Sequence, residues 1–339
     1  MRITIGEIAR IAGVSKTTVS RVLNDKPDVD PGTREKILAL ISQYSFQPNA
    51  FAKAISLQKS HHIGLLIPHK AEYVFSNPFY TEVMHGVSVQ VDRCGYYLLI
   101  CYAHEVNYLD IYNQKRVDGF ILLSPGSFNT QIIDTLNKEQ VPFVSTAKIA
   151  DKQGMIYVDI DNFHAGSLVI EHLVSLGHRK IAYIGKPSLT SSIERMQGYR
   201  AVLEKYNLPF SESWVYTTDT SSTASGHEYT HRVLREPDRP TAIFLANDVM
   251  AIGAINAVEE MGLRVPEDIS IVGFDDIPLA SYITPPLTTV RQPTFEKGSE
   301  AARMLVNLLE ENSLPQSKIM DVELVVRGST GPAPLDRSH

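Results

Sequence analysis

A short stretch near the N-terminus places basic and hydroxyl side chains at a spacing that suits contact with a polyanion. Lys16, Thr17, Ser20 and Arg21 would share the exposed face of one helix. A lysine ammonium can donate to the O6 and N7 atoms of guanine, and a threonine methyl can contact the methyl group of thymine. The hydroxyl groups better suited to phosphate oxygens belong to Thr18, Ser20 and Thr33. The alternative is a plain three-helix bundle whose polar face meets only water.

The first helix that would support this face begins with a capping box. Thr4 can accept a hydrogen bond from the third helical N–H while Glu7 reaches back to the cap, and Gly13 ends the helix. Ser15 caps a second helix over residues 16–23. Two short helices joined by so tight a turn must cross at a steep angle, which defines the helix-turn-helix unit.

A third helix is needed to close a core beneath this unit. Asp30 and Pro31 supply its N-cap and a proline in its first turn. The apolar stripe that it would bury consists of Ile37, Leu40, Ile41 and Tyr44. The sequence therefore predicts an all-α helix-turn-helix headpiece over residues 1–47.

Charge is distributed unevenly along the chain, although the formal net charge is only −6. Residues 1–60 carry nine Lys or Arg and five Asp or Glu, whereas the remaining residues carry 23 basic and 33 acidic groups. A basic head on an acidic body indicates a polyanionic partner for the head alone. The alternative is a small basic domain that simply stays hydrated.

The segment after the headpiece favours helix but is short. Asn49 is a good N-cap after Pro48, and alanines follow it up to Ser56. Isolated helices below ~12–15 residues are marginal in water. We therefore expect residues 49–56 to become ordered only against a partner.

These residues together resemble the headpiece of the lactose-repressor (LacI/GalR) family, through residues 5–24, 33–37 and 48–52. The resemblance implies that residues 48–60 form a hinge helix and linker, and that the hinge helix pairs with its copy in the DNA minor groove. Ile55 occupies the position of the family's leucine or methionine that wedges open a base step. The candidate DNA-binding residues are Thr4, Ser15, Lys16, Thr17, Thr18, Ser20, Arg21, Asn24, Thr33, Asn49, Ala52, Lys53 and Ile55.

From residue 61 onwards, short apolar runs alternate with helical stripes. The runs predict strands at residues 63–67, 97–101, 117–123, 142–145, 181–184, 242–245 and 269–273. Continuous apolar strands separated by helices indicate parallel sheets that are covered on both faces. Because about 280 residues exceed one comfortable core, we expect two such lobes.

The resemblance to the lactose-repressor family continues through this body, in segments such as residues 77–80, 115–119, 177–181, 239–243 and 272–276. It implies an α/β periplasmic-binding-protein-like core of two doubly wound parallel-sheet lobes over residues 61–339. The N-lobe would comprise residues 61–160 and 291–319, and the C-lobe residues 161–290 and 320–330. Ligands of open α/β sheets bind where the carboxyl ends of the strands converge, which here is the cleft between the lobes.

Three polar positions match the family's effector-binding residues, and each suits a sugar-like ligand. Arg195 offers a planar fork of donors, Asn247 can donate and accept, and Asp275 can accept two hydroxyl protons. Phe79 and Phe274 could form an apolar wall beside them. The alternatives are loop capping for Asn247 and Asp275, an ordinary surface role for Arg195 and simple core packing for Phe79.

Departures from the family pattern bear on the charge of that ligand. Thr220 stands where many members place an aromatic residue, which weakens ring stacking on that side. Ala147 stands where several members carry an acidic residue, with Lys148 beside it and His69 at the end of the first strand. Lys148 and His69 would favour an anionic ligand such as a sugar phosphate or a sugar acid.

Other classes of protein find little support in the sequence. Motifs for phosphate-binding loops, nucleophile elbows and HExxH metal sites are missing, so we expect no enzyme, no cofactor and no metal. Cys94 and Cys101 fit neither a disulfide framework nor a zinc knuckle. No apolar run approaches the ~18 residues of a membrane span and no signal peptide is visible, which predicts a cytoplasmic, nucleoid-associated protein without a membrane partner.

We therefore interpret the chain as a homodimeric transcription repressor. Two headpieces related by a twofold axis would read a pseudo-palindromic operator in double-stranded DNA. A sugar-like effector between the lobes would change their relative angle, and with it the spacing of the two hinge segments. The alternatives are a solute-binding module that does not touch DNA, an NAD-dependent enzyme, and a regulator of non-sugar metabolism that a co-repressor activates.

Overall fold

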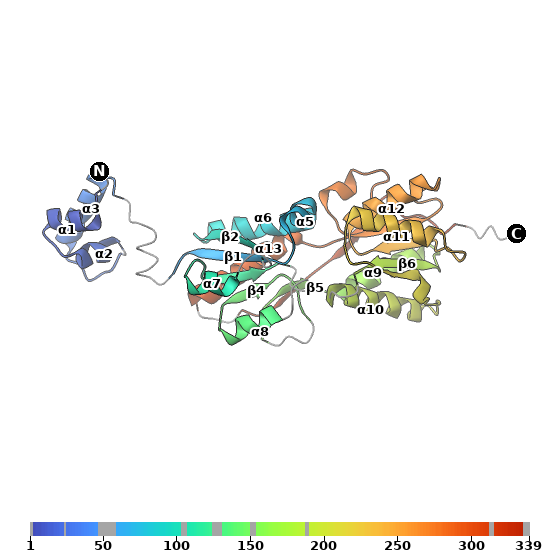
Figure 1. The fold of residues 1–339 in the computed structure, drawn as a ribbon, viewed down its shortest axis with the longest axis horizontal. Helices are drawn as coiled ribbons and strands as arrows, with labels where there is room; N and C mark the ends of the chain where they lie inside the picture. Colours follow the sequence, from blue (N-terminus) through green and yellow to red (C-terminus); the bar gives the residue numbers. More distant parts are fainter. Residues whose placement is uncertain are drawn as a thin grey trace. The chain divides into compact units, whose positions relative to one another are not determined.

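In the computed structural model, the described residues of the first unit of the chain, residues 1–61, form three helices (Figure 1). They are α1 (Ile5–Ala12), α2 (Lys16–Leu23) and α3 (Pro31–Gln43). The predicted capping box is present on α1, and Gly13 ends that helix with a φ of 76°. Buried side chains from all three helices form one core, which consists of Ile8, Ala9, Ala12, Val19, Val22 and Ile37. Tyr44, which was expected in this core, is instead 45% exposed, because it follows the last turn of α3 as its C-cap.

The structure describes residues 3–23, 25–46, 59–102, 107–123, 131–149, 154–186, 190–311 and 315–334. We call the first unit the headpiece and the second unit, residues 62–339, the core. In the ranges described, no helix is long and apolar enough to cross a lipid bilayer.

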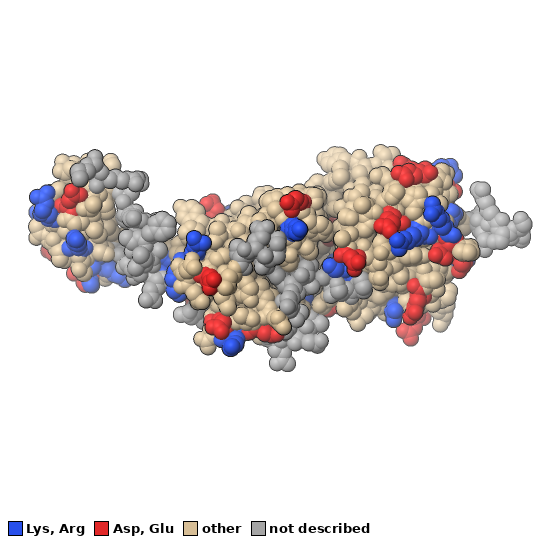
Figure 2. Space-filling view, viewed as in Figure 1, with Lys and Arg blue, Asp and Glu red and all other residues tan. Residues whose placement is uncertain are grey.

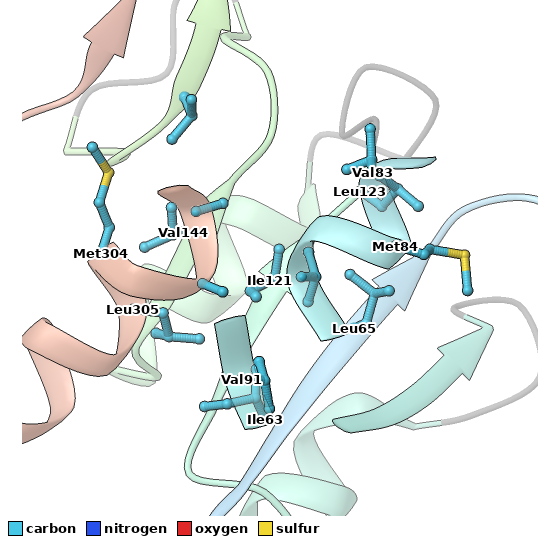
Figure 3. Close-up of a cluster of buried hydrophobic side chains, with 14 of the residues drawn as sticks. Ile63, Leu65, Val83, Met84, Val91, Ile121, Leu123, Val144, Met304 and Leu305 are labelled. Carbon is cyan, nitrogen blue, oxygen red and sulfur yellow. The ribbon is translucent and has the colours of Figure 1, made fainter. Parts of the chain in front are cut away.

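The N-lobe of the core is built on a parallel four-stranded sheet in the order β2-β1-β3-β4. Its strands are β1 (His62–Ile67), β2 (Tyr97–Tyr102), β3 (Gly119–Leu122) and β4 (Phe143–Ser145). Its helices are α5 (Ala71–Ser76), α6 (Pro78–Arg93), α7 (Tyr108–Asn113), α8 (Gln131–Lys138) and α13 (Thr294–Glu311). Residues from α6 and α13 pack on one face of the sheet, as the cluster in Figure 3 illustrates, and residues from α7 and α8 pack on the other.

The C-lobe contains a six-stranded sheet in the order β12-β10-β9-β8-β6-β7. Its strands are β6 (Ile181–Gly185), β7 (Val215–Thr217), β8 (Ala242–Leu245), β9 (Ser270–Asp275), β10 (Thr288–Arg291) and β12 (Glu323–Val325). Helices α9 (Asn162–Ser175) and α10 (Thr190–Lys205) cover one face, and α11 (Thr223–Leu234) and α12 (Asp248–Glu260) cover the other (Figure 1). Two short 3-10 helices, Glu212–Trp214 and Pro278–Ser281, complete the lobe.

The chain passes between the lobes three times. The first and third crossovers pair as a two-stranded parallel sheet of β5 (Val158–Ile160) and β11 (Lys318–Met320), and the second joins β10 to α13. The predicted fold class, a helix-turn-helix headpiece with a two-lobed α/β core, is confirmed, with one exception. Strand β12 runs antiparallel to β10, because the last crossover returns the chain along the edge of the C-lobe sheet.

Reciprocal glycines bring the major helix pairs of both lobes into backbone contact. The pairs are Gly86 and Gly298 for α6 and α13, Gly166 and Gly198 for α9 and α10, and Gly226 and Gly253 for α11 and α12. A Cβ atom on Gly198, for example, would lie 2.2 Å from the carbonyl oxygen of Phe163. Each helix pair is thus fixed at a distance that no side chain at these positions would permit.

We expect Gly198→Ala to lower the free energy of unfolding of the core by about 1–3 kcal/mol or more, because the added methyl group overlaps rigid backbone rather than a flexible side chain. Urea denaturation measures the loss. Glu204→Ala, at an exposed position on the same helix, is the matched control and should change the free energy by less than about 0.5 kcal/mol. Equal stability of Gly198→Ala and the control would show that α9 and α10 can separate at little cost.

Candidate functional site

Residues from both lobes of the core line a cavity of about 250 Å³, which has room for a small solute. Side chains at the ends of strands and at the starts of helices supply most of its polar groups. The lining includes His69, Tyr73, Phe79, Thr146, Lys148, Asp159, Asn162, Lys186, Arg195, Thr220, Asn247, Asp275, Gln292 and Lys297. The predicted effector-binding residues, apart from Phe274, therefore lie around one cavity.

Arg195 projects from α10 and is only 8% exposed, which excludes an ordinary surface role. Its Nε donates to Oδ1 of Asn162 at 2.9 Å, and its Nη1 donates to the carbonyl oxygen of Ala246 at 2.9 Å. Its guanidinium carbon lies 3.4 Å from the centre of the Phe274 ring. Its Nη2 has no hydrogen-bond partner among the residues that the structure describes, so the guanidinium can still donate into the cavity.

Phe274 does not form the apolar wall that the sequence predicts. Its side chain is fully buried beneath the guanidinium of Arg195, and it is absent from the cavity lining. As a strand residue next to Asp275, it points to the opposite face of the sheet edge and serves as a platform for the arginine. Phe79 does line the cavity, and it packs edge-on against Tyr80 with ring centres 5.3 Å apart. Tyr73, which the sequence did not single out, and Tyr80 supply further aromatic rings of the lining.

Asn247 combines the two roles that the sequence left open. Its Oδ1 accepts a hydrogen bond from the N–H of Met250 at 2.9 Å and so caps α12. Its Nδ2 has no partner within the described parts of the chain. The cap fixes the orientation of the amide, and the nitrogen is left to donate to a ligand.

Asp275 ends β9 in a conformation that is rare for a residue with a side chain, with a φ of 116°. Its Oδ1 accepts a hydrogen bond from Nε2 of Gln292 at 2.5 Å. Burial raises the pKa of Asp275 to about 7, although Arg195, Gln292 and Lys297 act in the opposite direction. Near neutral pH this carboxyl group can therefore be either an acceptor or a donor.

A buried ion pair lies beside Asp275 and was not predicted. Nζ of Lys297, on α13, lies 3.0 Å from Oδ1 of Asp159, on β5, and both side chains are about 5% exposed or less. The other oxygen of Asp159 accepts a hydrogen bond from the backbone N–H of Lys148 at 2.8 Å. A charged residue inside the apolar run Val158-Asp159-Ile160 is the sequence signal that could have identified this pair.

Positive charge at the cavity comes from different residues than expected. Burial, reinforced by the nearby Lys186, lowers the pKa of His69 to about 4, so near pH 7 this ring lines the cavity as a neutral hydrogen-bonding group rather than as a cation. Nζ of Lys148 lies 3.4 Å from Oε1 of Glu194, which balances its charge. Lys186, which the sequence did not suggest, has no carboxylate partner among the described residues and lines the cavity.

The headpiece presents Lys16 and Thr17 as exposed side chains in the first turn of α2. Ser15 accepts a hydrogen bond from the N–H of Thr18 at 3.0 Å and so caps α2 as predicted. Thr4 caps α1, and Thr33 donates to the N-cap Asp30 at 3.1 Å, so both hydroxyls also stabilise helix starts. Figure 2 shows Lys and Arg side chains over the headpiece with some Asp and Glu among them, and basic and acidic side chains intermixed over the core.

The other candidate DNA-binding residues fall into two groups, those that the structure describes and those that lie outside the described residues. Arg21 forms an exposed ion pair with Asp28, which a phosphate would have to displace, and Ser20 is half-buried. The remaining candidates lie outside the described residues: Asn24, Asn49, Ala52, Lys53 and Ile55.

Comparisons with known proteins agree with this architecture. The sequence family described as bacterial regulatory proteins of the lacI family matches residues 4–49, and a periplasmic binding protein-like domain matches residues 170–330. The HTH-type transcriptional regulator DegA of Bacillus subtilis is 36% identical over 98% of this chain and 99% of its own length.

Solved structures extend the comparison to complexes. The transcriptional regulator CelR in complex with cellobiose is 32% identical, with a TM-score of 0.74 over 97% of this chain and all of that one. The lac repressor dimer bound to operator and the anti-inducer ONPF is 28% identical, with a TM-score of 0.82 over 98% of this chain and all of that one. Because DegA is 36% identical along nearly the whole length of this chain, the chain belongs to the lacI family of bacterial transcription regulators.

Proposed function

We propose that this DNA-binding repressor acts as a homodimer on a pseudo-palindromic operator and that a sugar-like effector in the core cavity controls its affinity. Residues 1–47 would read the operator, residues 48–60 would form the paired hinge, and residues 61–339 would bind the effector and dimerise. Its site of action would be the cytoplasmic nucleoid. The observation that carries the effector assignment is the convergence of Arg195, Asn247 and Asp275 on one cavity.

The free hydrogen-bonding groups in this cavity support a sugar as the effector. Counting only partners in the described residues, Arg195 and Asn247 each retain a donor, and the Oδ2 atom of Asp275 remains available as an acceptor. Such groups match the hydroxyls of a polyol, and the rings of Tyr73 and Phe79 supply an apolar surface for its C–H groups. The cellobiose complex of CelR supports the same class of ligand.

A second candidate effector is an anionic sugar derivative, such as a sugar acid. Lys186 and Arg195 support it, because the described residues offer neither of them a hydrogen-bonded carboxylate. A ligand carboxylate would meet the fork of Arg195 in a strong charge-assisted contact.

Transmission to DNA would depend on polar contacts between segments of different lobes. Gln292 lies in the second crossover and its side chain reaches Asp275 of the C-lobe sheet, whereas Lys297, on the helix α13 that follows, reaches Asp159 of the first crossover. An effector that bonds to Asp275 competes with or reinforces these contacts, so it favours one lobe angle over another. Coupling free energies of this kind are typically ~1–3 kcal/mol.

We expect Lys16→Ala to relax base preference at one operator position at a cost of about 1–3 kcal/mol, because its ammonium group would contact a base edge in the proposed complex. Mobility-shift assays with selected operators at two salt concentrations measure both specificity and salt dependence. Lys26→Ala, also exposed in the headpiece but outside α2, is the control and should leave base preference unchanged. Absence of specific binding by the native protein at low salt would falsify the DNA-binding assignment.

We expect Arg195→Ala to abolish the effector response while operator binding without effector persists. A thermal-shift panel of glucose, cellobiose, glucuronate and galacturonate identifies the responsive sugar, which is then added to a mobility-shift assay. Arg200→Ala on the same helix is the matched control, because its guanidinium packs over Phe210 and does not line the cavity. A normal response of Arg195→Ala would refute the assignment of the cavity.

The pH dependence of effector affinity should distinguish the two classes of ligand. A neutral sugar that donates to Asp275 needs the ionised carboxylate, so its affinity should fall as pH drops through about 7, by up to about tenfold per pH unit. A sugar acid is repelled by that carboxylate, so its affinity should fall as pH rises through the same range. Isothermal titration calorimetry measures either trend, and Asp275→Asn should remove it. A trend that survives in Asp275→Asn would place the titrating group elsewhere.

A further inference from the structure

Two histidines and a glutamate meet on the surface of the C-lobe, away from the effector cavity. His227 and His231 lie on α11, and Glu260 is the last residue of α12. The Nε2 atoms of His227 and His231 lie 2.9 and 3.3 Å from the same atom, Oε2 of Glu260. The ligand atoms of all three residues lie within 4.8 Å of one another, and none of the three lines the cavity.

We propose that His227, His231 and Glu260 form a binding site for a divalent transition-metal ion such as Zn²⁺, which would link α11 to the end of α12. Imidazole nitrogen and carboxylate oxygen are ligands that zinc prefers. This proposal differs from the sequence-based expectation that the protein binds no metal.

The separation of the three atoms suits tetrahedral coordination. With metal–ligand bonds of ~2.0–2.2 Å, neighbouring ligand atoms of a tetrahedral zinc lie roughly 3.3–3.5 Å apart. The two nitrogen–oxygen distances of 2.9 and 3.3 Å need to open by only a few tenths of an ångström to reach that value. Solvent would complete the fourth position, because Glu260 is exposed and the two histidines are half-buried.

The helices place the two imidazoles so that they can bind the same ion. Residues four apart on a helix share one face, and the rings of His227 and His231 lie with their centres 4.7 Å apart. Both rings turn Nε2, rather than Nδ1, toward the carboxylate. A single ion at this point would therefore be reached by all three side chains without a change of helix register.

Close backbone packing of α11 against α12 fixes the separation of the two helices that carry the cluster. A Cβ atom added at Gly226, next to His227, would lie 2.0 Å from the carbonyl oxygen of Met250. A Cβ atom added at Gly253 would lie 2.0 Å from the carbonyl oxygen of Thr223. Helices α11 and α12 therefore cannot separate near His227 without losing this close backbone packing. A site held by rigid elements loses little entropy on binding.

The second coordination sphere predicts modest affinity. Nδ1 of His231 is buried and has no hydrogen-bond partner in the described structure. Metal-bound histidines usually donate this N–H to an acceptor, and loss of such a partner typically weakens binding ~10–100-fold. We therefore expect a reversible site that is weaker than a structural zinc centre.

Tag-free, full-length protein titrated with Co²⁺ and Zn²⁺ tests the proposal. We expect one Co²⁺ per chain with the visible absorption of a low-coordinate ion, displacement of that ion by Zn²⁺, and a rise in the melting temperature with Zn²⁺. His231→Ala and, separately, His227→Ala should weaken Zn²⁺ binding at least about tenfold in calorimetry. Glu260→Gln should also weaken it.

The matched control is His85→Ala, because His85 is an exposed histidine beside a single carboxylate, with its Nδ1 3.5 Å from Oε1 of Glu82. Its Zn²⁺ affinity should equal that of the native protein. Two results would overturn the proposal: no cobalt absorption in the native protein, or equal Zn²⁺ affinity in His231→Ala, His227→Ala and the native protein. Either result would identify the cluster as a simple hydrogen-bonded ion pair.

Discussion

The cavity of the core is organised around a buried cation, the guanidinium of Arg195. Burial of a charge is costly unless other groups replace its hydration, and here an amide oxygen, a backbone carbonyl and an aromatic face do so. The described structure gives this guanidinium no hydrogen-bonded carboxylate, so its positive charge remains available to an incoming ligand. The close approach of α9 to α10 sets its position, because a Cβ atom on Gly166 would lie 2.4 Å from the backbone oxygen of Arg195.

Buried charged groups at the crossovers between the lobes also need partners that replace their hydration. Lys297 and Asp159 neutralise each other in a buried pair, and Gln292 bridges toward Asp275. Removal of one member of such a network leaves its partner buried without compensation. The free-energy cost of that unpaired group exceeds the net stabilisation that the contact provides. Under the proposed function, lobe angle and ligand contact would therefore involve the same few polar groups, and a change in one would affect the other.

In the C-lobe, the two ends of the helix pair α11 and α12 have different neighbours. At their N-terminal ends, the caps Ser222 of α11 and Asn247 of α12 lie at or next to residues that line the cavity. At the far end of α12, Glu260 meets the two histidines of α11. Because Gly226 and Gly253 hold the pair in backbone contact between these ends, the two helices form one stiff layer over the sheet.

Local patterns in the sequence determined the headpiece and most of the central strands. The capping box of α1, the cap of α2 and the runs that became β1, β2, β6, β8 and β9 depend on neighbours only a few residues away. The sequence also pointed to Arg195, Asn247 and Asp275 through resemblance to a family. The short strands β5, β7, β10, β11 and β12 were not predicted as strands, because polar or charged residues interrupt each of them and leave no continuous apolar run. Only the tertiary structure placed Phe274 beneath Arg195, paired Lys297 with Asp159 and brought Glu260 to His227 and His231. Those contacts join residues far apart in the chain, and their energies depend on burial and mutual distance, which arise only when the chain has folded.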